Sequence, residues 1–271
     1  MDTKSKYKVV VIDIDGTFID DNEILPSENL SIFNSITQKG INAIFCSGRM
    51  LQSVEKFLKI NIGKVFPIIA YNGAMTKFNG EIIIDKKIPS TFASLIVKEV
   101  LEEKYYIQAY VNDELFVSED NEKAADYARH SNVAYYVPDD LLDFVEKHEP
   151  TKLLIIDEPE LLEGIGKEFR EKFNEVEIVK SFPTYLDIIP ANVDKGRALK
   201  ALCETMGILP EQTIVIGDND NDVPAFKIAG LSIAMENGTK SAKENADIIA
   251  PSNNDAGFAK IIEQLIGKNY L

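Results

Sequence analysis

The feature that most constrains this chain is an apolar run near its N-terminus that ends in two acidic residues. Val9–Ile12 is followed at once by the segment Asp13–Thr17, which reads Asp-Ile-Asp-Gly-Thr. A continuous run of Val and Ile predicts a strand buried on both faces, as in a parallel sheet, and such sheets bind ligands beyond the carboxyl ends of their strands. We therefore expect Asp13 and Asp15 at a ligand-binding edge. One carboxylate there can attack phosphorus, the other can move protons, and both can help to hold a hard divalent cation.

Length and charge narrow the class of protein. The chain has 271 residues, which suits two domains, and its formal net charge is −15. Such an acidic chain lacks the basic surface that nucleic acids and anionic membranes require, so we expect neither as a partner; a small phosphorylated metabolite can still bind locally. No apolar run reaches the roughly 18 residues of a membrane span, and the only apolar stretch near the N-terminus is interrupted by Asp13. The sequence thus predicts a cytoplasmic protein.

Strand-like runs alternate with helical patterns in both terminal parts of the chain, which is typical of a parallel sheet wound with helices. In the N-terminal part, Phe33 and Ile36 lie on one face of an expected helix that stops at Gly40. Further strands are expected at residues 41–45, 65–70, 213–216, 231–235 and 247–250, and further helices at 198–206, around 239–245 and at about 255–266.

The middle of the chain has a different pattern. Residues 85–187 predict the order helix, strand, strand, helix, strand, helix, strand, helix, strand, strand. Neighbouring strands joined by short turns predict a mixed or antiparallel sheet with helices on one side. We therefore expect a discontinuous core, residues 1–84 and 188–271, into which a second domain, residues 85–187, is inserted.

Four separated motifs occur in a fixed order: Asp13–Thr17, Ser47–Arg49, Lys195–Gly196 and Gly217–Asp222. As a set they resemble the four motifs of the haloacid dehalogenase superfamily. The segment Tyr71–Ala74 and the size of the insert are similar to those of its Cof-type subgroup. The resemblance implies an α/β fold, with a Rossmann-like parallel sheet as the core and an inserted α+β cap domain.

The same resemblance implies that Asp13 is phosphorylated during turnover, that Asp15 is the acid/base, and that Mg²⁺ is required. The residue chemistry is compatible with these roles. An ionised Asp13 can approach a phosphate dianion only if positive charge screens the repulsion, and Mg²⁺ and Lys195 can supply that charge. Because Asp218 directly follows a predicted strand, we expect it to bind the metal together with Asp13 and Asp15. Asp222 is expected in the second shell of the metal, where it orients waters or Lys195.

Four groups are candidates for binding the substrate phosphate: the Ser47 hydroxyl, the Gly48 amide, the Lys195 ammonium and the Asn221 amide. Asp220 is expected to face solvent. The two histidines, His130 and His148, fall in the insert, where we expect them to have structural or surface positions.

The predicted function is Mg²⁺-dependent hydrolysis of small phosphate monoesters, such as sugar phosphates or phosphorylated cofactors, through an aspartyl-phosphate intermediate. One alternative is a phosphosugar mutase of the same superfamily, which would depend on a bisphosphorylated activator. A second is a receiver-type signalling domain, which also surrounds a phospho-accepting aspartate with acids, Mg²⁺ and a lysine. A receiver would stop after stoichiometric labelling, whereas a phosphatase releases phosphate continuously.

Overall fold

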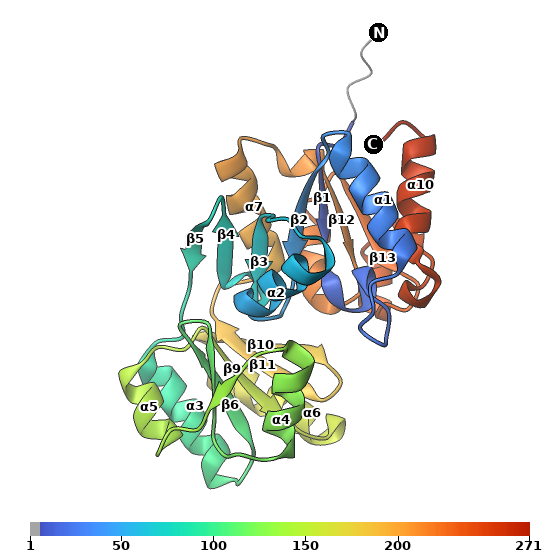
Figure 1. The fold of residues 1–271 in the computed structure, drawn as a ribbon. Helices are drawn as coiled ribbons and strands as arrows, with labels where there is room; N and C mark the ends of the chain where they lie inside the picture. Colours follow the sequence, from blue (N-terminus) through green and yellow to red (C-terminus); the bar gives the residue numbers. More distant parts are fainter. Residues whose placement is uncertain (1–5) are drawn as a thin grey trace.

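The computed structural model describes residues 6–271; the first five residues of the predicted core lie outside this range. The described chain forms two sheets, an eight-stranded core sheet and a six-stranded cap sheet (Figure 1). The strand order of the core sheet is β14-β13-β12-β1-β2-β3-β4-β5. Its strands are β1 (Val9–Ile12), β2 (Asn42–Cys46), β3 (Ile68–Ala70), β4 (Met75–Phe78), β5 (Glu81–Asp85), β12 (Thr213–Gly217), β13 (Leu231–Met235) and β14 (Ile248–Ala250).

Strand β1 lies in the middle of the core sheet, between β12 and β2, and pairs in parallel with both. Val10 and Ile12 face one layer of helices, whereas Val9 and Val11 face the other, so the strand is apolar throughout. The first layer contains α1 (Ser27–Gln38), α2 (Leu51–Asn61) and α10 (Gly257–Gly267). The second contains α7 (Lys195–Met206), α8 (Val223–Phe226) and α9 (Lys240–Glu244). The predicted α/β core is confirmed.

Two details of the core sheet differ from the sequence prediction. Strand β3 begins at Ile68 and not at Val65, whose side chain is 82% exposed. Strands β4 and β5 were not predicted, and they extend the parallel sheet in antiparallel fashion. They are joined by Asn79 and Gly80, which both have positive φ angles, of 49° and 87°. An Asn-Gly pair of this kind suits the tight turn of a hairpin.

The cap sheet has the strand order β10-β11-β9-β6-β7-β8 and is antiparallel except for the pair β7–β8. The predicted element order of this region and its mixed sheet are both found. The strands are β6 (Ile107–Val111), β7 (Glu114–Val117), β8 (Tyr135–Tyr136), β9 (Lys152–Ile156), β10 (Val176–Phe182) and β11 (Tyr185–Pro190). The helices are α3 (Ser90–Glu102), α4 (Glu122–Ser131), α5 (Leu141–Lys147) and α6 (Pro159–Lys172).

The core and the cap sheet meet through side-chain contacts near the carboxyl ends of the core strands. Asp113, in the turn between β6 and β7, accepts hydrogen bonds from the Tyr71 hydroxyl (2.7 Å) and the Gln52 amide (2.8 Å). The Ser53 hydroxyl donates to the carbonyl of Ser131 at 2.7 Å. The cap sheet is thus held over the edge at which the sequence motifs lie. Across residues 6–271, no helix is both long and apolar enough to cross a membrane.

Candidate active site

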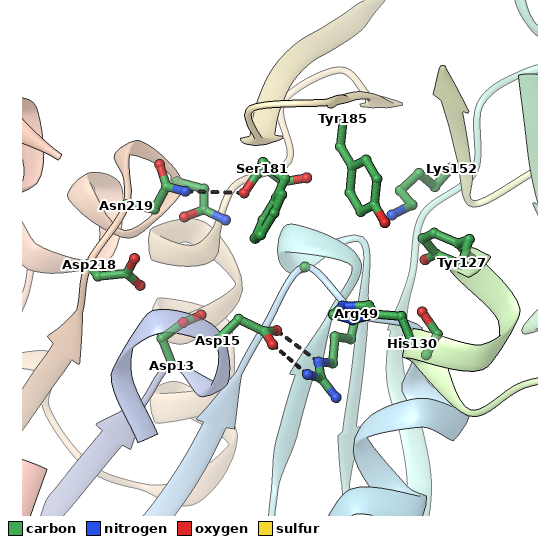
Figure 2. A pocket seen from close by; sticks show the side chains of 14 residues that line it. Asp13, Asp15, Arg49, Tyr127, His130, Lys152, Ser181, Tyr185, Asp218 and Asn219 are labelled. Atoms are coloured by element: carbon green, nitrogen blue, oxygen red, sulfur yellow. Dashed lines mark hydrogen bonds and ion pairs between the residues drawn. The ribbon is translucent and has the colours of Figure 1, made fainter. Parts of the chain in front are cut away.

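The adjacent strands β2, β1 and β12 bring three of the motifs together. Because these strands are parallel, their carboxyl ends lie at one edge, where they deliver Ser47, Asp13 and Asp218. The amide of Asp13 donates to the carbonyl of Ile216 at 3.0 Å, so the strand pairing continues up to the acidic residue itself. The remaining motif, Lys195–Gly196, begins helix α7, and the Lys195 side chain is buried. Figure 2 shows the pocket that opens at this edge.

Three carboxylates lie close together at this edge. Asp13, Asp218 and Asp222 each offer an oxygen atom, and these atoms lie within 4.8 Å of one another. The Lys195 ammonium lies 2.6 Å from Asp13 Oδ1 and 2.6 Å from Asp222 Oδ1. A single lysine leaves negative charge in excess at this buried place. Such a set of hard oxygen donors fits a divalent cation.

Burial and the neighbouring negative charges both raise the pKa values of carboxylates in this cluster. Burial holds the pKa of Asp13 well above its usual range, although the Lys195 ammonium opposes this shift. Burial and the neighbouring Asp222 carboxylate raise the pKa of Asp218 to about 7. A cation bound among the three carboxylates favours their ionised forms, so its binding would lower both pKa values.

Asp222 has a second task besides its contact with Lys195. Its Oδ2 atom accepts hydrogen bonds from the amides of Asp218 and Asn219, both at 3.0 Å, and this holds the loop after β12 in shape. Gly217 precedes the loop, where a Cβ atom would collide with the Asp222 carboxylate. Asp220 is exposed, as expected from the sequence, and accepts a hydrogen bond from the Thr239 hydroxyl at 2.6 Å.

Asp15 lies apart from the three clustered carboxylates and forms an ion pair with Arg49. The Arg49 guanidinium contacts both oxygens of Asp15, and its Nε atom donates to Oδ2 at 2.8 Å. Burial raises the pKa of Asp15, but Arg49 outweighs this effect and holds the pKa below its ordinary value. Arg49 was part of a recognised motif, yet the sequence assigned it no function. Its contact with Asp15 spans 34 positions in sequence and gives no local signal.

The candidate phosphate-binding residues differ in their access to the pocket. Gly48 and Asn221 line the pocket, whereas Ser47 and Lys195 are buried. Asn221 donates through Nδ2 to Oδ1 of Asn72 at 2.8 Å. The other amide atoms, Asn72 Nδ2 and Asn221 Oδ1, are buried and have no hydrogen-bond partner within residues 6–271. One hydrogen-bond donor and one acceptor beside Gly48 therefore have no partner within residues 6–271, as expected where a polar ligand binds.

The pocket has a volume of about 80 Å³ and is lined from both sheets. From the core come Asp13, Asp15, Gly48, Arg49, Asp218, Asn219 and Asn221; from the cap region come Tyr127, His130, Ser131, Lys152, Ser181, Phe182 and Tyr185 (Figure 2). The sequence did not single out any of the cap residues as part of a site. His130, for which a structural or surface position was expected, lies at the pocket, where its Nδ1 atom contacts the Glu23 carboxylate.

Comparison with known proteins agrees with this geometry. The chain belongs to the family of haloacid dehalogenase-like hydrolases, which it matches over residues 10–262. It is 27% identical to the 5-amino-6-(5-phospho-D-ribitylamino)uracil phosphatase of Bacillus subtilis, over 97% of this chain and 99% of that protein. It is 28% identical to the phosphoglycolate phosphatase of Methanopyrus kandleri, over 95% of this chain and 97% of that protein.

A solved structure from Thermotoga maritima is 41% identical to this chain, covers 95% of it and 97% of its own length, and superposes with a TM-score of 0.85. The match extends over both sheets, since it covers almost the whole chain. Family membership and the named relatives together identify the chain as a phosphatase, an enzyme that hydrolyses phosphoric monoesters.

Proposed function

We propose that the chain is a Mg²⁺-dependent phosphatase that hydrolyses small phosphate monoesters through an aspartyl phosphate on Asp13. The observation that carries this proposal is the position of Asp13. Its carboxylate lies at the end of a central strand, next to a buried lysine and two further carboxylates, and it lines the pocket. This is the arrangement that a carboxylate nucleophile needs, because opposite charge must screen it from the phosphate.

The metal would be held by Asp13 and Asp218, with Asp222 in support. The sequence had placed the Asp15 carboxylate among the ligands as well, but in the structure this carboxylate is engaged by Arg49. When bound, the divalent cation supplies positive charge for the phosphate and for the clustered carboxylates. We infer Mg²⁺ because the donor set consists of carboxylate oxygens without nitrogen or sulfur ligands.

In the first half of the reaction, an oxygen of Asp13 attacks phosphorus and the bond from phosphorus to the ester oxygen breaks. The departing alkoxide takes a proton from Asp15, which must therefore be protonated at that stage. Since Arg49 lowers the pKa of Asp15, this role requires that their ion pair opens when substrate enters. Lys195, Ser47, the Gly48 amide and Asn221 bind the phosphoryl oxygens.

In the second half, water attacks the phosphorus of the aspartyl phosphate and gives its proton to Asp15. The bond between phosphorus and the Asp13 oxygen breaks, so inorganic phosphate leaves and Asp13 is regenerated as a carboxylate. Asp15 can accept this proton because it became ionised when it protonated the leaving group in the first half. Asp15 thus ends each cycle protonated again, with a proton from water in place of the one that left with the alcohol.

The substrates are small phosphorylated metabolites, in line with the small pocket and with the ribityl and glycolate esters named for the two phosphatase relatives. Sugar phosphates and phosphorylated cofactors are the classes we expect. We propose that residues 85–187 act as a cap that excludes water and contacts the leaving group, while residues 1–84 and 188–271 carry the chemistry. The expectation of a cytoplasmic location rests on the sequence alone.

The proposal is tested by measuring phosphate release from a panel of phosphate monoesters with and without Mg²⁺. Continuous release that stops on removal of the metal supports the assignment. Labelling that ends after one equivalent would instead indicate a receiver-type protein. A requirement for a catalytic amount of a sugar bisphosphate, with the phosphate retained in the product, would indicate a phosphosugar mutase.

A further inference from the structure

One face of the cap sheet is apolar, and the other is mixed, since it carries Leu154 and Ile156 as well as charged side chains. The apolar face, which includes Leu153 and Leu186, packs against α3, α5 and α6. The opposite face carries Lys152 of β9 and Asp187 of β11, and it is turned toward the active site, since Lys152 lines the pocket (Figure 2). Charged residues are rarely buried in a protein unless they are paired, and burying them is costly. The proposed reaction makes no use of this pair.

Lys152 and Asp187 are in direct contact. The Lys152 Nζ atom lies 2.8 Å from Asp187 Oδ1 and 4.6 Å from the centre of the Tyr110 ring, and the two charged side chains are 4% and 0% exposed. Both carboxylate oxygens of Asp187 are buried and make no hydrogen bond within residues 6–271, although Oδ1 lies within ion-pair distance of Lys152 Nζ. Lys152 lines the pocket, and Asp187 lies beside it without lining the pocket itself. A buried charged pair whose acidic member lacks hydrogen bonds therefore lies next to the pocket.

Each basic side chain that lines the pocket contacts a carboxylate. Arg49 is paired with Asp15 and Lys152 with Asp187, and the His130 ring contacts Glu23. A second anionic group on the substrate would therefore meet no unmatched positive charge among the lining residues. It would also approach the negative charge of the paired carboxylates, which is unfavourable at low dielectric.

Aromatic rings also line the cap side of the pocket. Tyr127 and Tyr185 have ring centres 5.8 Å apart, and the ring centres of Phe182 and Tyr185 are 5.5 Å apart. All three residues line the pocket. Aromatic faces provide large apolar contact area, which suits the carbon backbone of a sugar or polyol.

We propose that Lys152 and Asp187 form a hydroxyl-binding site for the leaving group, so that the preferred substrates are monophosphates of neutral sugars or polyols. Lys152, which lines the pocket, donates a hydrogen bond to a substrate hydroxyl, while Asp187 beside it balances the charge of the ammonium group. A hydroxyl group accepts this bond without bringing charge, whereas a carboxylate or second phosphate would also approach the negative charge of Asp187. This inference rests on the proposed phosphatase function and assigns specificity-determining residues to it.

The first test compares kcat/KM of the wild-type enzyme for sorbitol 6-phosphate, glucose 6-phosphate, phosphoglycolate and fructose 1,6-bisphosphate. We expect the two neutral leaving groups to exceed the two anionic ones by about tenfold or more. Lys152→Met should then lower kcat/KM for the two neutral esters by about 10 to 100-fold, because a charged hydrogen-bond donor is lost. The reference substrate, p-nitrophenyl phosphate, has no hydroxyl group to bind there and should change by less than about threefold.

The second test is a change in the ranking of substrates, which loss of folding cannot produce. Asp187→Asn leaves the Lys152 cation unmatched, so the ratio of kcat/KM for phosphoglycolate to that for sorbitol 6-phosphate should rise by about tenfold. The matched control is Lys123→Met. This change breaks another ion pair of the cap region, with Asp157 at 2.8 Å, but neither residue lines the pocket. The control should keep the wild-type ranking of substrates.

The outcomes separate this inference from the function on which it rests. A wild-type enzyme that prefers the anionic esters contradicts the hydroxyl-binding site but leaves the phosphatase assignment intact. So does a folded Lys152→Met enzyme that loses activity equally on all esters, or an Asp187→Asn enzyme with an unchanged ratio. A wild-type protein that releases phosphate from none of the five esters in the presence of Mg²⁺ overturns both.

Discussion

The core edge gathers three carboxylates, those of Asp13, Asp218 and Asp222, around the single cation Lys195, whereas the cap sheet buries Asp187 against Lys152. Charge is thus unbalanced on one side of the pocket and balanced on the other. The unbalanced side fits the divalent cation proposed above, whose charge would let a phosphate dianion approach. The balanced side suits a part of the substrate that carries no charge. The difference indicates which end of a monoester lies against which wall.

The largest effect is expected at the nucleophile. Asp13→Asn keeps the size and shape of the side chain but removes the attacking oxygen anion, so phosphate release should fall at least about 1,000-fold for every substrate. Circular dichroism and thermal unfolding of the purified variant show whether the fold is kept. Activity above a few per cent of wild type, with contaminating phosphatase excluded, would contradict the assignment of Asp13.

The buried lysines Lys195 and Lys152 allow a direct comparison of the core side and the cap side of the pocket. Lys195→Met removes the only cation within residues 6–271 that forms an ion pair with the clustered carboxylates, so kcat/KM should fall at least about 100-fold for p-nitrophenyl phosphate and sugar phosphates alike. Lys152→Met is the matched variant, and its loss should be confined to hydroxyl-bearing substrates. If both variants lose activity with the same substrate profile, the two walls do not have separate roles.

Alanine variants of the acidic residues after β12 should weaken the response to Mg²⁺ by amounts that depend on where each carboxylate lies. Asp218→Ala should raise the Mg²⁺ concentration needed for half-maximal activity by more than about 100-fold, and Asp222→Ala by about 10 to 100-fold. Asp220→Ala is the control, because Asp220 is exposed and contacts Thr239. Titration of activity with Mg²⁺ measures all three. An effect of Asp220→Ala as large as that of Asp218→Ala would show that the assignment of Asp218 as the metal ligand is wrong.

The smallest effect is expected where the two regions touch, at Asp113. Burial raises the pKa of this carboxyl above its ordinary value, although hydrogen bonds from Tyr71 and the Gln52 amide oppose the shift. The folded protein thus binds this proton more tightly than the unfolded chain does. The contribution to the free energy of unfolding is therefore greatest below the unfolded pKa near 4 and decreases as the pH rises through the folded pKa.

Asp113→Asn removes this titration. Relative to wild type, the variant should gain stability as the pH is raised from about 4 to 7, which urea unfolding at several pH values measures. Asp126→Asn, at an exposed position on α4, is the control and should run parallel to wild type. A difference between wild type and Asp113→Asn that does not change with pH would show that Asp113 titrates alike in both states.

The core half of the site could be predicted because local sequence determines it. A strand end places its next residue at the edge of the sheet, so Asp13, Ser47 and Asp218 were expected together before their contacts were known. The cap half could not, because Lys152 and Tyr185 reach the pocket only through the docking of one sheet on the other. No spacing in the sequence reports that docking.

The same reasoning explains the errors within the fold. The hairpin of β4 and β5 was missed because its strands are short, with 4 and 5 residues, and a short apolar run such as Ile82–Ile84 does not by itself distinguish a strand from a helix. The ion pair between Asp15 and Arg49 was missed because a resemblance between motifs gives residue types but not contacts. The position of Arg49, two residues after Ser47 in a recognised motif, was the signal available.

The path of the chain between the two sheets has a consequence for how such an enzyme changes over generations. The polypeptide leaves the core sheet after β5 and returns through β11, and the residues proposed above to act on the phosphate ester all lie outside this segment. One continuous segment of the chain therefore forms the side of the pocket that is proposed to face the leaving group. Mutations in that stretch can exchange one metabolite for another while every intermediate generation retains a working bond-cleaving centre. Diversity of substrates is thus accessible in small heritable steps.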